Sequence, residues 1–166
     1  MSDRFADTTL ADFAAHEAQN TAALAELDTM RAKALELADR DAAAYARLAA
    51  LWKLPEGDAT RARDFQPAVR EAIDAPQAIV DLAHRACALL AELPARTNPR
   101  LGSDLAIAAS LASLAADAAE WNVRVNLPSL EDTAQARTHG TRTAAQVEKA
   151  RALAAETVAA VRSRTS

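Results

Sequence analysis

The chain has 166 residues, a formal net charge of −4, and basic residues that are spread along its length rather than clustered. These features argue against nucleic acid or an anionic membrane surface as a partner. With a single cysteine, Cys87, and three histidines, the sequence offers no internal disulfide and no zinc-ligand spacing.

Long alanine–leucine stretches, few glycines and the lack of alternating β-branched runs predict an all-α fold. We expect a single-domain bundle of long antiparallel helices over residues 1–166. Thr8 or Thr9 can cap a short first helix that carries Leu10 and Phe13. A long second helix is predicted from about Asn20 to Trp52. Its apolar stripe consists of Leu27, Met30, Ala34, Leu37, Ala44, Tyr45, Leu48 and Trp52.

The middle of the chain is divided by prolines. The segment LPEGD at 54–58 ends the long helix. Pro67 and Pro76 both suit the first turn of a helix, so 67–75 and 76–93 form either two helices or one kinked helix. The loop PARTNPRLG then leads into a helix that Ser103 or Asp104 is expected to cap.

The C-terminal part predicts two more helical segments. SLED at 129–132 and TAAQ at 143–146 are similar to capping boxes, and Gly140 between them predicts a break. The apolar residues of the last segment are Val147, Leu153, Val158 and Val161.

Compartment and assembly follow from composition. The longest uncharged stretch, 105–116, is shorter than the roughly 20 residues that span a bilayer, and the N-terminal residues contain no apolar signal core. We therefore expect a soluble, cytoplasmic protein. Hydrophobic residues make up 51% of the chain but aromatic residues only 4%, so alanine supplies much of the apolar material and one copy has a thin core. Since a second copy can complete such a core, we expect a homodimer.

Asp41 is the residue whose position most strongly suggests chemistry. Leu37, Asp41, Ala44 and Leu48 follow each other at three- and four-residue steps, which places a carboxylate within the apolar stripe. Apolar surroundings raise the pKa of a carboxyl group, as proton transfer near neutral pH requires. The alternative is that Asp41 lies at the edge of the stripe and pairs with an arginine.

Two other polar groups allow a binding or a structural interpretation. Asn122 and Asn126 are four residues apart, so they share a helix face, and their amides can bond a heterocycle. They can equally satisfy backbone groups where this helix ends. Four basic residues lie around the turn that follows the long helix: Lys53, Arg61, Arg63 and Arg70. They can hold an anionic ligand or form a solvated charged surface.

Four segments between Asp39 and Asp132 share the order and spacing of motifs in one enzyme family. DAAAYARLAALWKLP resembles a D-x-x-A-[FY] segment with a Leu-Pro stop, and AVREAIDAP resembles an alanine-rich helix with proline. NPRLGSDLAIAA resembles an Asn, Ser-Asp and Ala-Ala segment, and NVRVNLPSLED an Asn-Val-x-x-Asn-Leu ending. Together they resemble the cyclodeaminase/cyclohydrolase family of folate enzymes, which includes the C-terminal domain of formiminotransferase-cyclodeaminase and methenyltetrahydrofolate cyclohydrolases.

The resemblance implies a pocket for a reduced folate as the small-molecule partner. Ser103, Asp104, Asn122 and Asn126 would line or support this pocket, and Asp41 matches the position of the catalytic aspartate. The implied chemistry is at the N5/N10 one-carbon unit of tetrahydrofolate, either cyclodeamination of the 5-formimino compound or hydrolysis of the 5,10-methenyl compound. Neither reaction requires a metal or a redox cofactor.

The sequence departs from the family pattern in its N-terminal part. Members usually carry a proline followed by a Gly-Gly-Gly-Ser segment, whereas here no glycine precedes Gly57. A glycine-rich turn lets backbone amides approach a ligand, which a continuous alanine-rich helix cannot do. Three hypotheses follow: a folate enzyme with Asp41 as general acid/base, a non-catalytic folate-binding or assembly protein of the same fold, and a helical bundle unrelated to folate.

Overall fold

The computed structural model describes residues 15–165, which contain four long helices and two short 3-10 helices. These are α2 (Glu17–Trp52), α3 (Ala59–Ala91), η1 (Pro99–Leu101), α4 (Gly102–Asn126), η2 (Leu127–Ser129) and α5 (Thr133–Thr165). No strand occurs in this part of the chain, so the all-α prediction is confirmed for it. The predicted short first helix lies outside the described residues.

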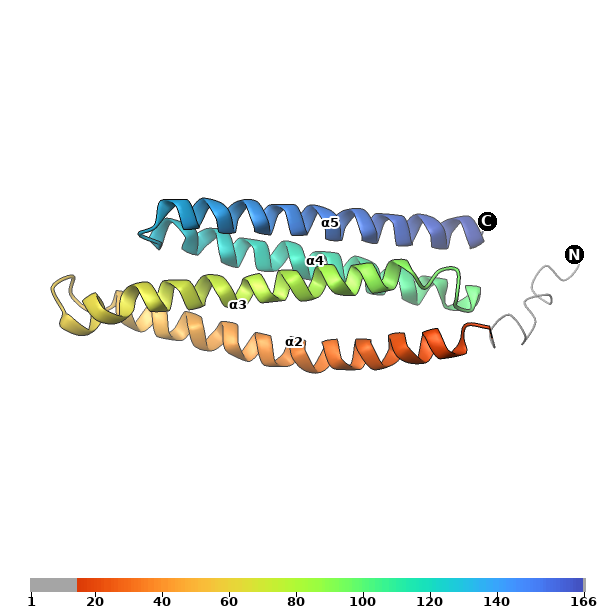
Figure 1. Ribbon diagram of the computed structural model, residues 1–166, viewed down its shortest axis with the longest axis horizontal. Coiled ribbons are helices and arrows are strands. Elements are labelled where there is room, and N and C mark those ends of the chain that lie inside the picture. The colour runs from red at the N-terminus through yellow and green to blue at the C-terminus, as the bar shows by residue number, and fades with distance from the viewer. Residues whose placement is uncertain (1–14, 166) are drawn as a thin grey trace, which may run out of the picture.

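The four long helices lie side by side along one axis, and α2 is at the edge of the bundle (Figure 1). α3 packs against α2, α4 and α5, and α4 also packs against α5. α2 packs chiefly on α3. Three helices therefore share one core, and much of the α2 surface is left uncovered.

α3 is one helix although it contains two prolines. It begins at Ala59 because the Asp58 carboxylate accepts hydrogen bonds from the backbone N–H groups of Thr60 and Arg61, at 2.7 and 3.0 Å. Both Pro67 and Pro76 lie inside it. Of the two arrangements expected for 67–93, the single helix is therefore the one found, and it begins earlier than predicted.

A side chain from α4 compensates for one of these prolines. Pro76 has no N–H, so the carbonyl oxygen of Ala72, four residues earlier, lacks its helical donor. The Asn126 side-chain amide, Nδ2, donates to this oxygen at 3.1 Å. Since Ala72 is buried, an unpaired oxygen there would be costly. Asn126 thus has a structural role at the end of α4.

The predicted cap of α4 is wrong. The helix begins at Gly102, Leu101 occupies the cap position, and no side chain makes a capping hydrogen bond there. Asn98 instead caps the preceding η1 turn, accepting from the Arg100 N–H at 3.0 Å. Since η1 leads directly into α4, Ser103 and Asp104 lie within the first turn of a helix that has already started.

α5 is also continuous, so the predicted break near Gly140 is wrong. Asp132 caps the helix by accepting from the N–H groups of Ala134 and Gln135, both at 2.9 Å. Gly140 lies inside the helix, where a Cβ would come within 3.2 Å of a Leu127 methyl carbon. Close packing on η2, rather than a break, accounts for this glycine. TAAQ is not a cap either, because Thr143 is a fully buried mid-helix residue.

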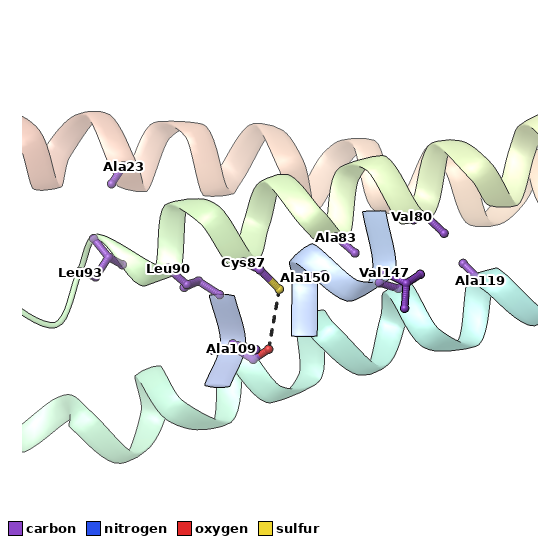
Figure 2. Close-up of a cluster of buried hydrophobic side chains, with 12 residues drawn as sticks. Ala23, Val80, Ala83, Cys87, Leu90, Leu93, Ala109, Ala119, Val147 and Ala150 are labelled. Carbon is purple, nitrogen blue, oxygen red and sulfur yellow. Dashed lines mark hydrogen bonds between the residues drawn. The ribbon is translucent and has the colours of Figure 1, made fainter. Parts of the chain in front are cut away.

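The core of the bundle is built largely from small side chains (Figure 2). Cys87 on α3 faces the Ala109 carbonyl on α4, with 4.0 Å between sulfur and oxygen, and Val147 and Ala150 of α5 belong to the same buried cluster. A second cluster toward the other end combines α2, α3 and α4 residues such as Leu48, Ile73 and Val123. Alanine contacts of this kind bring helices close together but bury little area per residue.

The large apolar side chains that stay exposed belong to only some of the helices. All ten belong to α2, η1 or α4, and none in residues 15–165 belongs to α3 or α5. Tyr45 and Trp52 are among them, at 66% and 44% exposed, which corrects their assignment to the buried stripe. The helical stretch Pro99–Ser129 is long and apolar enough to cross a membrane by length and composition, with only 17% of the tested window buried.

Candidate functional site

Asp41 lies at the border between the buried and the exposed side of α2. Leu37, Ala44 and Leu48 on the same side of the helix are buried against α3, while Asp41 itself is half-buried. At 3.6 residues per turn, Tyr45 is about 40° around the helix from Asp41, on the side away from the α3 contact. Tyr45 is exposed. The carboxylate therefore lies between an apolar core and an apolar surface.

The Asp41 carboxylate has no hydrogen-bond or ion-pair partner among residues 15–165. The arginines that bridge α2 and α3 bind other acids: Arg47 binds Glu71 at 2.8 Å, and Arg85 binds Glu26 at 2.6 Å. The expected alternative, an arginine pair for Asp41, is therefore not found. With no partner to offset it, burial raises the pKa of the Asp41 carboxyl above its ordinary value.

This combination suits proton transfer. A carboxylate that is partly withdrawn from water and has no partner within residues 15–165 can accept or donate a proton and can stabilise a neighbouring cation. Asp39 provides the contrast, because it lies two residues away on the exposed side of the same helix. The two aspartates thus form a natural test pair.

Lys53 begins the turn between α2 and α3, and Arg61, Arg63 and Arg70 lie within the first part of α3. Lys53 is exposed, and its backbone N–H closes the C-terminal end of α2. Arg61 donates from Nη1 to the Leu54 carbonyl at 2.8 Å, and its guanidinium lies 5.5 Å from the centre of the Phe65 ring. Twelve residues separate Lys53 from Asp41, which is about 18 Å along the helix. Within one chain, Lys53 is thus remote from the carboxylate.

The four predicted binding residues of α4 lie at its two opposite ends. Ser103 and Asp104 are exposed in the first turn, whereas Asn122 and Asn126 belong to the last turns. At 1.5 Å per residue, Asp104 and Asn122 are about 27 Å apart along the axis. One chain therefore does not gather these residues into a single pocket.

The two asparagines differ in what they contact. Asn126 is engaged with Ala72 and also donates to the Asn122 backbone oxygen at 2.8 Å. The side chain of Asn122 makes no contact of this kind within the described part of the chain and is exposed. Asn122 is thus the one of the pair that is available to a ligand.

A buried polar cluster between α3 and α5 was not expected from the sequence. Gln77 and Thr143 are both buried and bonded to each other, and the Asp81 carboxylate accepts from Arg142 Nη2 at 2.5 Å. The signal that could have indicated it is the pair Gln77 and Asp81, four residues apart on one helix face. In the described residues no group of three histidine, cysteine or acidic side chains is arranged to hold a metal.

Comparison with protein families decides the ancestry of the chain. A family model described as formiminotransferase-cyclodeaminase matches residues 6–146. The chain belongs to the formiminotransferase-cyclodeaminase family. The match includes every predicted site residue of the chain, from Asp41 to Asn126, and the N-terminal half of α5. No curated protein matches the sequence.

Membership connects the chain to folate-related one-carbon metabolism and confirms the resemblance seen in its motifs. The matched region also contains the part of the chain in which the glycine-rich segment is expected. From Glu17 to Trp52 this part is continuous helix without a glycine. No turn of backbone amides is therefore present along α2.

Proposed function

We propose that this protein acts on the N5/N10 one-carbon unit of a tetrahydrofolate, with Asp41 as the general acid/base. The observation that carries the proposal is the half-buried Asp41 carboxylate, which has no partner within residues 15–165 and a raised pKa, in a chain of this family. A structural carboxylate in such surroundings would normally be paired. A carboxylate that contacts a substrate must be free of such a partner, as Asp41 is among these residues.

Asp41 would serve either of two reactions. In the cyclohydrolase reaction, water adds to the cationic methenyl carbon and the ring opens to the 10-formyl compound; Asp41 would accept the proton of the attacking water. In the cyclodeaminase reaction, N10 attacks the formimino carbon and ammonia leaves; Asp41 would take the proton from N10 and deliver one to the leaving nitrogen. In both, the carboxylate also stabilises positive charge beside it.

We propose a cytoplasmic homodimer that binds a folate as its small-molecule ligand and uses no metal or redox cofactor. The net charge of −4 and the scattered basic residues support the view that neither nucleic acid nor a membrane is a partner. Of the predicted binding residues, Asn122 and the exposed pair Ser103 and Asp104 would contact the folate, with Lys53 available to its anionic tail.

A second candidate is a non-catalytic folate-binding or assembly protein of the same fold. The lack of any glycine before Gly57, and the continuous helix from Glu17 to Trp52, favour it. Without a glycine-rich turn, backbone amides are missing from one wall of the expected pocket. Such a protein would bind folate without converting it.

The test is to supply each substrate separately and follow its product. Loss of 5,10-methenyltetrahydrofolate is measured by absorbance, and ammonia release from 5-formiminotetrahydrofolate by a coupled assay, each against buffer alone. Acceleration of one reaction identifies the enzyme. If neither is accelerated but a reduced folate raises the melting temperature, the binding protein is correct; ligand at 100 times its Kd should add about 2.7 kcal/mol of stability. If there is neither turnover nor stabilisation, both candidates are wrong.

A further inference from the structure

The outer face of α4 carries an apolar stripe that no other helix of residues 15–165 covers, although the Arg124 guanidinium of α4 itself lies 5.2 Å from the centre of one ring in it, that of Trp121. Its members recur at alternating steps of four and three residues, the spacing of a coiled-coil seam. They are Ile107, Leu111, Leu114, Ala118, Trp121 and Val125, and all six are exposed. The charged residues between its first and last member, Asp117, Glu120 and Arg124, occupy other positions of the helix. We call these six residues the α4 stripe.

The α4 stripe is symmetric about Ala116. Ile107 and Val125 are each nine residues from this centre, Leu111 and Trp121 are each five, and Leu114 and Ala118 are each two. A two-fold axis at the middle of the helix would therefore place each member opposite a member of an antiparallel copy. Each layer would combine residues of different size, as in Leu114 opposite the partner's Ala118, so that the seam interdigitates.

We propose that α4 pairs antiparallel with α4 of a second copy of this chain, about a two-fold axis near Ala116. The area available fits such an interface. The five large members of the α4 stripe are 57% to 66% exposed, or on the order of 100 Å² each. Together they offer about 500 Å² per copy, or about 1,000 Å² for the pair, which reaches the lower bound of a specific interface.

A second copy accounts for this surface better than a bilayer does. α4 packs along α3 and α5, and these helices carry exposed charges such as Arg85 and Arg142. Inserting α4 into a membrane would bring those charges into the hydrocarbon region. The two-fold symmetry of the stripe has no use at a membrane surface, whereas a homodimer requires a self-complementary patch.

Antiparallel pairing also brings together what one chain keeps apart. Within a chain, Asp104 and Asn122 are about 27 Å apart along α4. In the pair, the partner's Asp104 lies level with residue 128, within about 9 Å of Asn122 along the axis. Two identical groups of polar side chains would form, and each would combine residues from the first turn of one α4 with residues from the last turns of the other. This consequence for the folate site rests on the proposed function, whereas the pairing itself does not.

The test measures assembly without folate, so its outcome is independent of turnover. Sedimentation equilibrium at micromolar concentration should give a dimer for the wild type and a monomer of unchanged helicity for Leu114→Glu. Ala152→Glu, at an exposed position of α5, is the matched control and should remain dimeric. A monomeric wild type, or a dimer that Leu114→Glu leaves intact, would overturn the proposal, as would sedimentation of the wild type with phosphatidylcholine or phosphatidylglycerol vesicles.

The direction of pairing is tested by crosslinking. The chain with both Ile107→Cys and Val125→Cys is oxidised, and its disulfide-linked peptides are identified by mass spectrometry. Antiparallel pairing predicts intermolecular links between positions 107 and 125, and parallel pairing would give 107–107 and 125–125 links instead. Cys87 is buried, so the wild type is expected to give no crosslink and serves as the control.

Discussion

Replacing Asn126 by alanine should destabilise the protein because Pro76 has made the Ala72 carbonyl dependent on it. Asn126 Nδ2 donates to this oxygen at 3.1 Å, and Ala72 is buried. Leaving a buried acceptor unpaired costs about 1–3 kcal/mol. For a chain of this size, that corresponds to a fall in melting temperature of about 2–12 °C.

A double-mutant cycle isolates the cause. In a Pro76→Ala background, the N–H of residue 76 can donate to the Ala72 oxygen, so Asn126→Ala should cost less than about 0.5 kcal/mol there. Asn122→Ala is the control and should change stability by no more than about 0.5 kcal/mol, because its side chain is exposed. The assay is urea unfolding followed by circular dichroism at one protein concentration. Equal costs of Asn126→Ala in both backgrounds would refute the compensation.

Further substitutions test Asp41 and the helix contacts. Asp41→Asn should leave the stability at neutral pH unchanged or raise it slightly, because burial raises the pKa of Asp41 and an amide has no charge to desolvate. A loss above about 1 kcal/mol in urea unfolding would instead indicate that Asp41 forms an ion pair. Since the folded pKa of Asp41 lies above the ordinary 3.8, its contribution to stability is greatest below pH 3.8 and declines as pH rises through the folded pKa. The free energy of unfolding, measured across this pH range, should therefore decline in the wild type and in Asp39→Asn but not in Asp41→Asn. If it also declines in Asp41→Asn, a group other than Asp41 causes the pH dependence. Gly102→Ala should cost about 1–3 kcal/mol, because the new Cβ would lie 2.9 Å from a Val161 methyl carbon. Gly57→Ala, where a Cβ meets nothing within 4 Å, should be neutral or stabilising, and equal thermal shifts for the two glycine variants would contradict this account.

The regular parts of the fold could be predicted because their signals are local and repeated. The helical period across 20–52 extends over many turns, so the end of α2 and the burial of Leu37 and Leu48 agree with the sequence-based expectation. The half-buried position of Asp41 follows from the same period. A pattern that repeats over nine or ten turns outweighs the irregularity of any single residue.

The errors arose where a local signal is overridden by a distant contact. Gly140 suggested a break, but Leu127 packs closely on it. Pro76 left two arrangements open, and Asn126 supplies the missing donor in the single helix that is found. Tyr45 has the right period for the core, yet no element of residues 15–165 covers its side of α2. None of these partners can be identified from sequence spacing. The separation of Asp104 from Asn122, by contrast, follows from the predicted helix itself, because 18 residues at 1.5 Å per residue extend about 27 Å.

The most direct test of the central claim compares kcat/KM of the wild type with that of Asp41→Asn on the substrate that the protein converts. General acid/base catalysis by Asp41 predicts a loss of about 100-fold to 10,000-fold in the variant, with KM little changed and Asp39→Asn as active as the wild type. A variant that retains more than half of the wild-type rate would show that another group performs the proton transfer, and the proposed role of Asp41 would be wrong.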